Sequence, residues 1–324
     1  MFVDAPILCP NVPGNVEDQG YAGGGAGGAI RRGRSRQPPR LRLRERLRTI
    51  QDIWRSGVSL MPGGRAIRIL DLCCGTKALK DACEYFKSKG YEIEYVGVDS
   101  NGFCTPDGPE LQGDILRWRE LPKLVSLPVG YFDLIWGSPP CRYFSRGNAR
   151  ATKSQIKSAE KIVQAVKDCI IHFAPPSWVI ENPVGRLGHV PSMTISPRSR
   201  CPLMRTARRH TVSYCMYGSL YRKRTHLWSN IQDLENLLLN CTAETPCPLL
   251  LGGLESHARV CQHGVSTSTG TGGVPDVNER YRPPQGLLTV VCKKAVEQAR
   301  AMRWRRGGLF EGAHPSPGQR GVVG

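Results

Sequence analysis

A buried strand and a tight turn are encoded by Ile67-Arg68-Ile69-Leu70-Asp71-Leu72-Cys73-Cys74-Gly75-Thr76-Lys77. A short run of branched apolar residues followed by a glycine is typical of a β-strand that ends in a sharp turn. A helical pattern from Ala78 to Gly90 follows directly. Strand, turn and helix in this order predict the opening unit of a parallel sheet whose faces are covered by helices.

The same alternation continues along most of the chain and decides the fold class. Further elements are expected as strands at 95–99, 132–136, 178–180 and 211–216, and as long helices at 154–173 and 286–302. We therefore predict an α/β, Rossmann-like fold with a doubly wound, mostly parallel sheet. Ligands bind beyond the carboxyl ends of such strands, so one cleft should gather the strand-end residues Asp71, Asp99, Cys141 and Glu181.

Composition divides the chain into a folded middle and two low-complexity ends. Residues 1–60 are rich in glycine and arginine, which predicts a mostly disordered basic leader, and 304–324 predict a disordered tail. The α/β domain is expected at 61–230, and 276–303 should supply its closing helix. Between them, 231–275 form a small insertion rich in Cys, Gly, Thr and Ser.

Positive charge is in large excess, with a formal net charge of +18. Nine arginines lie between Arg31 and Arg48, against the single acid Glu45. No acidic residue occurs between Glu181 and Asp233, although that stretch holds many arginines. Such a surplus favours a polyanionic partner, most simply a nucleic acid.

The cysteines and the apolar runs bear on the cellular compartment. The 13 cysteines are odd in number and irregularly spaced, and several lie inside apolar runs, which predicts reduced thiols in an intracellular protein. No apolar run is long enough to cross a membrane, and no secretory signal is evident. The arginine-rich segment fits a nuclear address or an organellar transit element, so the compartment stays open.

Two turns at strand ends carry residues that are suited to cofactor binding or catalysis. A glycine turn such as the one at Gly75 lets a nucleotide-like cofactor approach the backbone, and Asp99 at the next strand end can accept ribose hydroxyls. Pro139 and Pro140 stiffen the chain before Cys141 and can hold its side chain in a fixed position. A cysteine held in this way could act as a nucleophile.

A thiol and a carboxyl group on neighbouring strands suggest a specific reaction. Attack by Cys141 on carbon 6 of cytosine makes carbon 5 able to take a methyl group, and covalent catalysis of this kind divides one hard step into easier ones. Glu181, kept protonated by burial, could hold ring nitrogen 3. Arg222 and Arg224 are candidates for favouring the thiolate and holding the base oxygen.

These residues belong to a series of short motifs, which are Asp71-Leu72-Cys73-Cys74-Gly75, Val98-Asp99, Gly113-Asp114-Ile115, Pro139-Pro140-Cys141 with Phe144-Ser145, Glu181-Asn182-Pro183, Tyr217-Gly218 before Arg222-Lys223-Arg224, and Arg280-Tyr281-Arg282-Pro283-Pro284. In kind and in order they resemble the motifs of the DNA cytosine-5 methyltransferase family. The resemblance covers about residues 66 to 300.

The resemblance implies a class I methyltransferase fold, S-adenosylmethionine as methyl donor and double-stranded DNA with a flipped-out target base as substrate. It makes 61–230 the catalytic domain and 231–275 a target-recognition region, and we expect a monomer. The implied catalytic residues are Cys141, Glu181, Arg222 and Arg224. The implied cofactor-binding residues are Asp71, Cys73, Gly75, Asp99, Asp114 and Pro139, with Asp114 facing the adenine amine.

Some positions depart from the family pattern. Cys73 stands where the family usually has phenylalanine, and Lys77 stands where it has a second glycine. Arg142 and Tyr221 each replace a glutamine, and Pro183 replaces a valine. These variants look like the small divergent enzymes of viruses and phages, for which the nucleus or another part of the host-cell interior is the expected location.

Three other functions stay open on the sequence alone. The first is an RNA cytosine-5 methyltransferase of the tRNA type, which can share the Pro-Pro-Cys and Glu-Asn-x motifs. The second is a DNA methyltransferase acting on an exocyclic amine, which needs no thiol. The third is a degenerate methyltransferase fold retained as a DNA-binding module.

Cysteines and histidines are concentrated in the insertion. Cys241, Cys247, His257, Cys261 and His263 are of the types that bind zinc, and a small loop-rich region gains most from a metal. They form no Cys-x-x-Cys pair, and their spacing matches no known zinc motif. No metal site is therefore predicted, and Cys241, Cys247, His257 and Cys261 remain zinc candidates only.

Overall fold

The structure, a computed structural model, describes residues 65–100, 108–145, 148, 150–219, 223–247 and 282–307, without the side chains of 304–307. A seven-stranded sheet in the order β3-β2-β1-β4-β5-β7-β6 forms its centre. The strands are β1 (Ile67–Leu72), β2 (Ile93–Asp99), β3 (Leu111–Gln112), β4 (Leu134–Gly137), β5 (Ser177–Pro183), β6 (Arg208–Ser213) and β7 (Arg224–Ser229).

One strand of the sheet, β7, runs opposite to the other six. β1 pairs in parallel with both β2 and β4, β2 with β3, and β4 with β5, whereas β7 is antiparallel to β5 and to β6. The order 3-2-1-4-5 is that of a Rossmann-like sheet, and it reverses between β1 and β4. The prediction of a doubly wound, mostly parallel α/β fold is confirmed.

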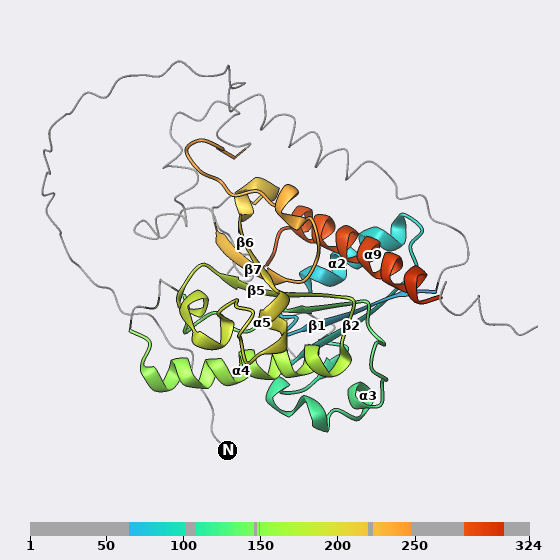
Figure 1. Ribbon diagram of the computed structural model, residues 1–324, viewed down its shortest axis with the longest axis horizontal. Coiled ribbons are helices and arrows are strands. Elements are labelled where there is room, and N and C mark those ends of the chain that lie inside the picture. The colour runs from blue at the N-terminus through green and yellow to red at the C-terminus, as the bar shows by residue number, and fades with distance from the viewer. Residues whose placement is uncertain are drawn as a thin grey trace, which may run out of the picture. The chain divides into compact units, whose positions relative to one another are not determined.

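Helices cover both faces of the sheet (Figure 1). On one face lies α4 (Lys153–Phe173), and on the other α2 (Ala78–Ser88) packs beside α9 (Gln285–Gly307). Each face has its own apolar core, and the completely buried Ile170 and Leu288 are examples from the two cores. The shorter elements are α3 (Pro122–Val125), α5 (Pro202–Thr206) and the 3₁₀ turns η1 (Ile115–Glu120), η2 (Arg186–His189), η3 (Pro191–Met193), η4 (Tyr214–Tyr217) and η5 (Leu234–Asn236).

Local signals explain where α4 begins and ends. Thr152 accepts a hydrogen bond from the backbone N–H of Gln155, whose side chain accepts one from the backbone of Thr152, and this reciprocal cap satisfies two otherwise unpaired donors. Ala174, in the left-handed conformation, ends the helix. The predicted helix at 154–173 is confirmed.

The C-terminal strands differ from the expectation. A strand was predicted at 211–216, but β6 spans Arg208–Ser213 and η4 then turns the chain, so that prediction was wrong for 214–216. β7 was not anticipated at all, because its sequence Arg-Thr-His-Leu-Trp-Ser has polar residues that become buried only through pairing with β5 and β6. Pairing between strands, which a local pattern cannot show, decides this part of the sheet.

The domain core continues beyond the expected boundary at residue 230. Ile231, Leu234, Leu239, Cys241 and Cys247 are buried in the same apolar cluster as α9. Residues 231–247 therefore pack as part of the α/β domain. The remainder of the proposed target-recognition region, the leader 1–60 and the tail from 308 lie outside the described residues. In the described part of the chain, no helix is both long and apolar enough to span a membrane.

Candidate active site

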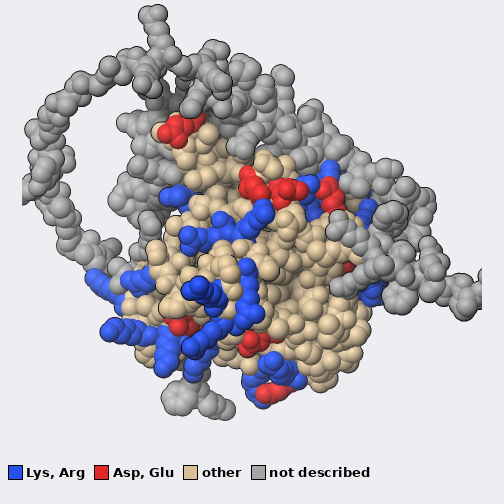
Figure 2. Space-filling model, in the orientation of Figure 1, with Lys and Arg blue, Asp and Glu red and all other residues tan. Residues whose placement is uncertain are grey.

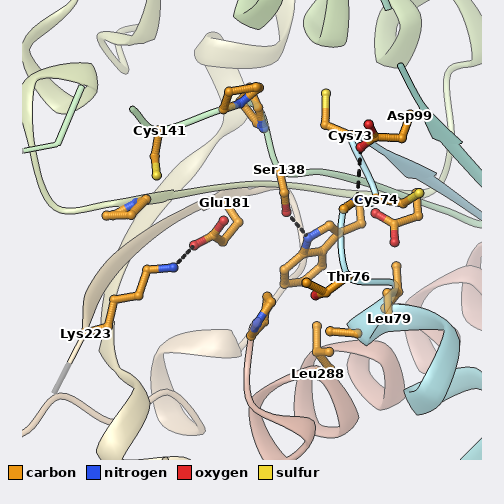
Figure 3. Close-up of a pocket in the computed structure, with 18 of the residues that line it drawn as sticks. Cys73, Cys74, Thr76, Leu79, Asp99, Ser138, Cys141, Glu181, Lys223 and Leu288 are labelled. Carbon is orange, nitrogen blue, oxygen red and sulfur yellow. Dashed lines mark hydrogen bonds and ion pairs between the residues drawn. The ribbon is translucent and has the colours of Figure 1, made fainter. Parts of the chain in front are cut away.

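A cavity lies where the strand order reverses, beyond the carboxyl ends of β1 and β4 (Figure 3). Its volume is about 380 Å³, which lies in the range of small-molecule sites. One end is lined by the turn after β1, and the other by Cys141 and Glu181. The switch point of the sheet thus joins the two motifs that the sequence singled out.

The turn after β1 has an unusual backbone. Cys73, Gly75 and Lys77 all have positive φ angles, of 58°, 47° and 52°. Lys77 carries a side chain in the left-handed region, which costs on the order of 1 kcal/mol. The Lys77 side chain is buried, and its ammonium group lies 3.5 Å from the carboxylate of Glu110.

The carboxylate of Asp99 holds this turn in place. Its Oδ2 accepts a hydrogen bond of 3.0 Å from the backbone N–H of Gly75, and the N–H of Cys74 donates to the carbonyl of Val98 at 3.2 Å. Asp99 also lines the cavity. The end of β2 therefore fixes the turn and presents an acid to the same space.

Asp71 is a buried acid at the base of the cavity. Its Oδ2 accepts a hydrogen bond of 2.9 Å from the hydroxyl of Tyr95. Burial raises the pKa of Asp71 to about 8, although the Tyr95 bond acts in the opposite direction. Burial likewise raises the pKa of the neighbouring Cys73 thiol, so at neutral pH both groups are mainly uncharged.

The loop that carries Cys141 is tied to the strands on either side of it. The N–H of Ser138 donates to the carbonyl of Leu72 at 3.0 Å, and the side-chain amide of Asn182 donates to the carbonyl of Pro139 at 2.9 Å. Further along, Ser145 forms a β-bridge with Gly185. The asparagine of the Glu-Asn-Pro motif therefore anchors the Pro-Pro-Cys motif.

Two donors face the carboxyl group of Glu181. The hydroxyl of Tyr214 donates to its Oε1 at 2.9 Å, and the ammonium group of Lys223 lies 4.0 Å from the same oxygen (Figure 3). The Lys223 ammonium also sits over the Tyr214 ring, 4.8 Å from its centre. The buried Glu181 and Tyr214 and the partly buried Lys223 form one polar cluster beside Cys141.

The environment of Cys141 has opposing effects on its thiol. Burial raises the pKa of Cys141, and the charge of Glu181 raises it as well, whereas the positive charge of Lys223 lowers it. The net shift is upward. Lys223 is therefore the described cation that favours the thiolate.

Most of the predicted site residues meet in this cavity. Its lining includes Asp71, Cys73, Gly75, Asp99, Pro139, Cys141 and Glu181. Asp114 does not line it: its side chain accepts from the N–H of Leu116 and caps η1. Arg224 does not line it either, because it is exposed at the start of β7. Arg222, His257 and Cys261 lie outside the described residues.

Sequence reasoning missed Lys223 and Tyr214. Successive side chains of an extended chain point to opposite sides, so Lys223 faces the cavity when Arg224 faces away. That alternation was a usable signal once β7 was known. Tyr214 had no signal, since it reaches Glu181 from a separate turn, η4.

Basic side chains gather on one face of the domain. Figure 2 shows Lys and Arg side chains clustered over α4 and α5, with few acids among them. Exposed members include Lys153, Lys157, Arg198, Arg200 and Arg205. The acid-free stretch after Glu181 thus contributes a positively charged surface.

Comparison with known proteins identifies one curated relative of viral origin. The chain is 27% identical over 237 residues to the "Probable DNA (cytosine-5)-methyltransferase" of Frog virus 3 (isolate Goorha), across 68% of this chain and 97% of the viral protein. No model of a known protein family matches. The chain is therefore related in sequence to a viral protein of that name.

Solved structures give more distant likenesses. A protein described as a DNA modification methyltransferase encoded within an E. coli prophage is 14% identical, with a TM-score of 0.37, over 51% of this chain and 46% of that one. The Entamoeba histolytica methyltransferase EhMeth is 14% identical, with a TM-score of 0.31, over 51% and 53%. The chain thus spans about half of each structure, and both likenesses are too distant to carry a functional inference.

Proposed function

We propose that this protein is a DNA (cytosine-5) methyltransferase that uses S-adenosylmethionine and a covalent Cys141 adduct. The observation that carries the proposal is the cavity that joins the turn after β1 to Cys141 and Glu181. The relationship to the Frog virus 3 protein supports the same function. A cofactor turn beside a thiol and a carboxyl group is what transfer of a methyl group to a ring carbon requires.

The β1 end of the cavity suits a nucleoside with an apolar wall beside it. Asp99 would accept the ribose hydroxyls, while Leu79 and Leu288 provide apolar surface. The turn at Gly75 lets a ligand approach the backbone closely. Bound there, S-adenosylmethionine would supply an electrophilic methyl group. The neutral state of Asp71 keeps this end of the site free of one buried negative charge.

Cys141 would act on carbon 6 of the target cytosine. Its sulfur forms a bond to carbon 6, and the ring electrons move toward nitrogen 3, which makes carbon 5 nucleophilic. After carbon 5 has gained the methyl group, a water molecule would take the proton from carbon 5, the carbon 5–carbon 6 double bond would form again, and Cys141 would leave carbon 6 as a thiolate. Lys223 would assist the first step by favouring the thiolate.

Glu181 would hold the ring nitrogen that accepts the developing charge. Tyr214 and Lys223 both engage Oε1, which fixes the orientation of the carboxyl group. In its protonated form, a carboxyl group that is fixed before reaction would donate its proton toward nitrogen 3 and so stabilise the negative charge there without reorganising. We therefore assign the contact with nitrogen 3 to Glu181, and the cationic role to Lys223 with Arg222 as a further candidate.

The proposed substrate is double-stranded DNA with its target base flipped out. A base inside the duplex cannot reach a thiol in a cavity of this kind, so flipping is required. The exposed arginines over α5, including Arg198, Arg200 and Arg205, would contact phosphates. Contacts of this type give affinity without sequence specificity.

Covalent trapping tests this proposal. The protein is incubated with S-adenosylmethionine and duplex DNA that carries 5-fluorocytosine, which cannot lose a proton from carbon 5. We expect a complex that survives denaturation and that is absent in Cys141→Ser. Cys169→Ser, which changes a buried thiol in α4, is the matched control and should still form the complex.

The same assay separates the rival functions. A complex that forms on 5-fluorocytosine RNA and not on DNA would support an RNA enzyme. Methylation of an exocyclic amine without any covalent complex would support the amine-directed class. If neither product forms while the protein still binds DNA, the result would support a DNA-binding module and refute the proposal.

A further inference from the structure

Three buried cysteines meet on the sheet face that carries α9, outside the cavity described above. The sulfur atoms of Cys215, Cys241 and Cys247 all lie within 4.8 Å of one another. All are almost completely buried, with at most 1% of their surface exposed. Cys215 belongs to η4, whereas the other two follow η5, so the group joins segments that are separate in the sequence.

Hydrogen bonds hold these segments together. The backbone N–H of Ser213 donates to the carbonyl of Leu239 at 3.0 Å, and the Ser213 hydroxyl donates to the side chain of Asn240 at 2.7 Å. The N–H of Leu239 donates to the hydroxyl of Tyr217 at 2.7 Å. The chain before Cys241 is therefore fixed against the turn that carries Cys215.

A tight turn brings the third cysteine back to the first two. The N–H of Thr242 donates to the carbonyl of Thr245 at 3.1 Å, and the N–H of Thr245 donates to the hydroxyl of Thr242 at 3.1 Å. The hydroxyl of Thr245 donates to the carbonyl of Asn240 at 2.9 Å. This turn reverses the chain between Cys241 and Cys247, so both side chains enter the same space.

The spacing of the sulfur atoms suits a tetrahedral metal site. Zinc binds thiolate sulfur at about 2.3 Å, which places two sulfur ligands of a tetrahedron roughly 3.8 Å apart. The three sulfur atoms lie within 4.8 Å of one another, so each distance between two of them would shorten by about 1 Å or less on metal binding. A disulfide could join only two of the three sulfurs and would leave the third beside it.

We propose that Cys215, Cys241 and Cys247 bind a structural zinc ion as thiolates. Sulfur ligands that are shielded from water are typical of structural zinc, and all three of these sulfur atoms are buried. The ion joins η4 to the segment after η5. Among the described residues, no fourth His, Cys, Asp or Glu joins the group.

The zinc site is next to the proposed active site. Cys215 follows Tyr214 directly, and the Tyr214 hydroxyl donates to Glu181. The N–H of Tyr214 also donates to the carbonyl of Lys223 at 3.1 Å. Metal binding at Cys215 therefore holds the turn that contacts both Glu181 and Lys223. This link concerns the proposed function, whereas the metal site itself does not depend on it.

Metal analysis of the full chain tests the proposal. Protein purified under reducing conditions from zinc-supplemented medium should contain about one zinc ion per chain. Cys215→Ser, Cys241→Ser and Cys247→Ser should each lower zinc affinity by more than about 100-fold, beyond the 10–100-fold that loss of an outer-shell partner costs. Cys169→Ser, a buried thiol in the other core, should keep full zinc content.

A second measurement uses the unchanged protein, since a serine variant can fail to fold. Cobalt(II) that replaces zinc should give thiolate charge-transfer bands and the visible bands of a tetrahedral site. Zinc should also protect these three cysteines from alkylation until a chelator is added. Zinc-free protein with all three thiols reduced and equally reactive with or without zinc would overturn the proposal, and so would a disulfide or iron at these positions.

Discussion

Lys223 is the residue whose charge most directly controls the proposed nucleophile. It lowers the pKa of Cys141, while burial raises that pKa above its ordinary value. The rate of adduct formation should therefore rise with pH until the thiol is ionised. Lys223→Met should move this profile to higher pH and slow adduct formation at neutral pH by about tenfold, which corresponds to one pKa unit.

The pH profile of single-turnover adduct formation measures this effect. Lys223→Arg is the matched control, because it keeps the positive charge and should keep most of the wild-type profile. A profile in Lys223→Met that is lower but not displaced along the pH axis would mean that Lys223 acts on the base or on Glu181 alone.

Asp71 should make the folded protein less stable as pH rises. Its folded pKa of about 8 lies above its ordinary value of 3.8, so between these values the folded state holds a proton that the unfolded state has lost. The associated stabilisation is present below about pH 4 and is lost as pH rises through 8. Asp71→Asn removes this dependence and still accepts the Tyr95 bond.

Denaturant unfolding without ligand at several pH values tests the role of Asp71. The stability of Asp71→Asn relative to wild type should increase by on the order of 1 kcal/mol per pH unit between pH 5 and 8. Parallel stability curves for the two proteins would show that Asp71 is ionised in the folded state.

At the scale of elements, the bridge between Ser145 and Gly185 couples the nucleophile loop to β5. A Cβ atom on Gly185 would lie 2.2 Å from the carbonyl oxygen of Phe144, a backbone atom that can yield only if the loop moves. Gly185→Ala should therefore lower the free energy of unfolding by about 1–3 kcal/mol. It should also slow adduct formation more than it weakens cofactor binding.

Gly188→Ala is the matched control for the bridge. The atom nearest to its Cβ, at 3.3 Å, belongs to the flexible side chain of Arg209, which can move aside. Equilibrium unfolding and trapping rates of the two variants should differ clearly. Equal effects would mean that the contact with Phe144 does not restrain the loop.

The elements also show how far local patterns reach. β1, β2, β4, α2 and α4 were predicted because the apolar pattern that marks each of them lies within the segment itself. β3 and β7 were not, since β3 is only Leu111–Gln112 and β7 is buried through its partners. The same cause hid Lys223 and Tyr214, whose positions depend on β7 and on η4.

At the scale of the whole molecule, the positive surface should determine the affinity for DNA. The logarithm of the affinity falls with the logarithm of the salt concentration, and each phosphate contact that is lost makes this slope less steep by about 0.9. Arg198→Gln with Arg200→Gln should therefore weaken binding to DNA of any sequence, and should make the slope less steep by up to about 2.

Binding titrations at several salt concentrations measure the slope. The control removes the same charge elsewhere, with Lys89→Gln on the side of α2 and Lys123→Gln in α3, both of them exposed. It should leave the slope nearly unchanged. Equal losses in the two variants would indicate that net charge alone, and not the face over α5, attracts DNA.

The sequence by itself determined the parallel α/β core and seven of the residues that line the cavity, because both depend on local order. Apolar runs fix the strands, and ligand-binding turns follow strand ends wherever the sheet is parallel. Only the tertiary structure decided which cation faces Cys141, what orients Glu181, and that Cys215 meets Cys241 and Cys247. Those pairings join segments distant in the chain, and strand register and turn packing, which no local pattern records, set them.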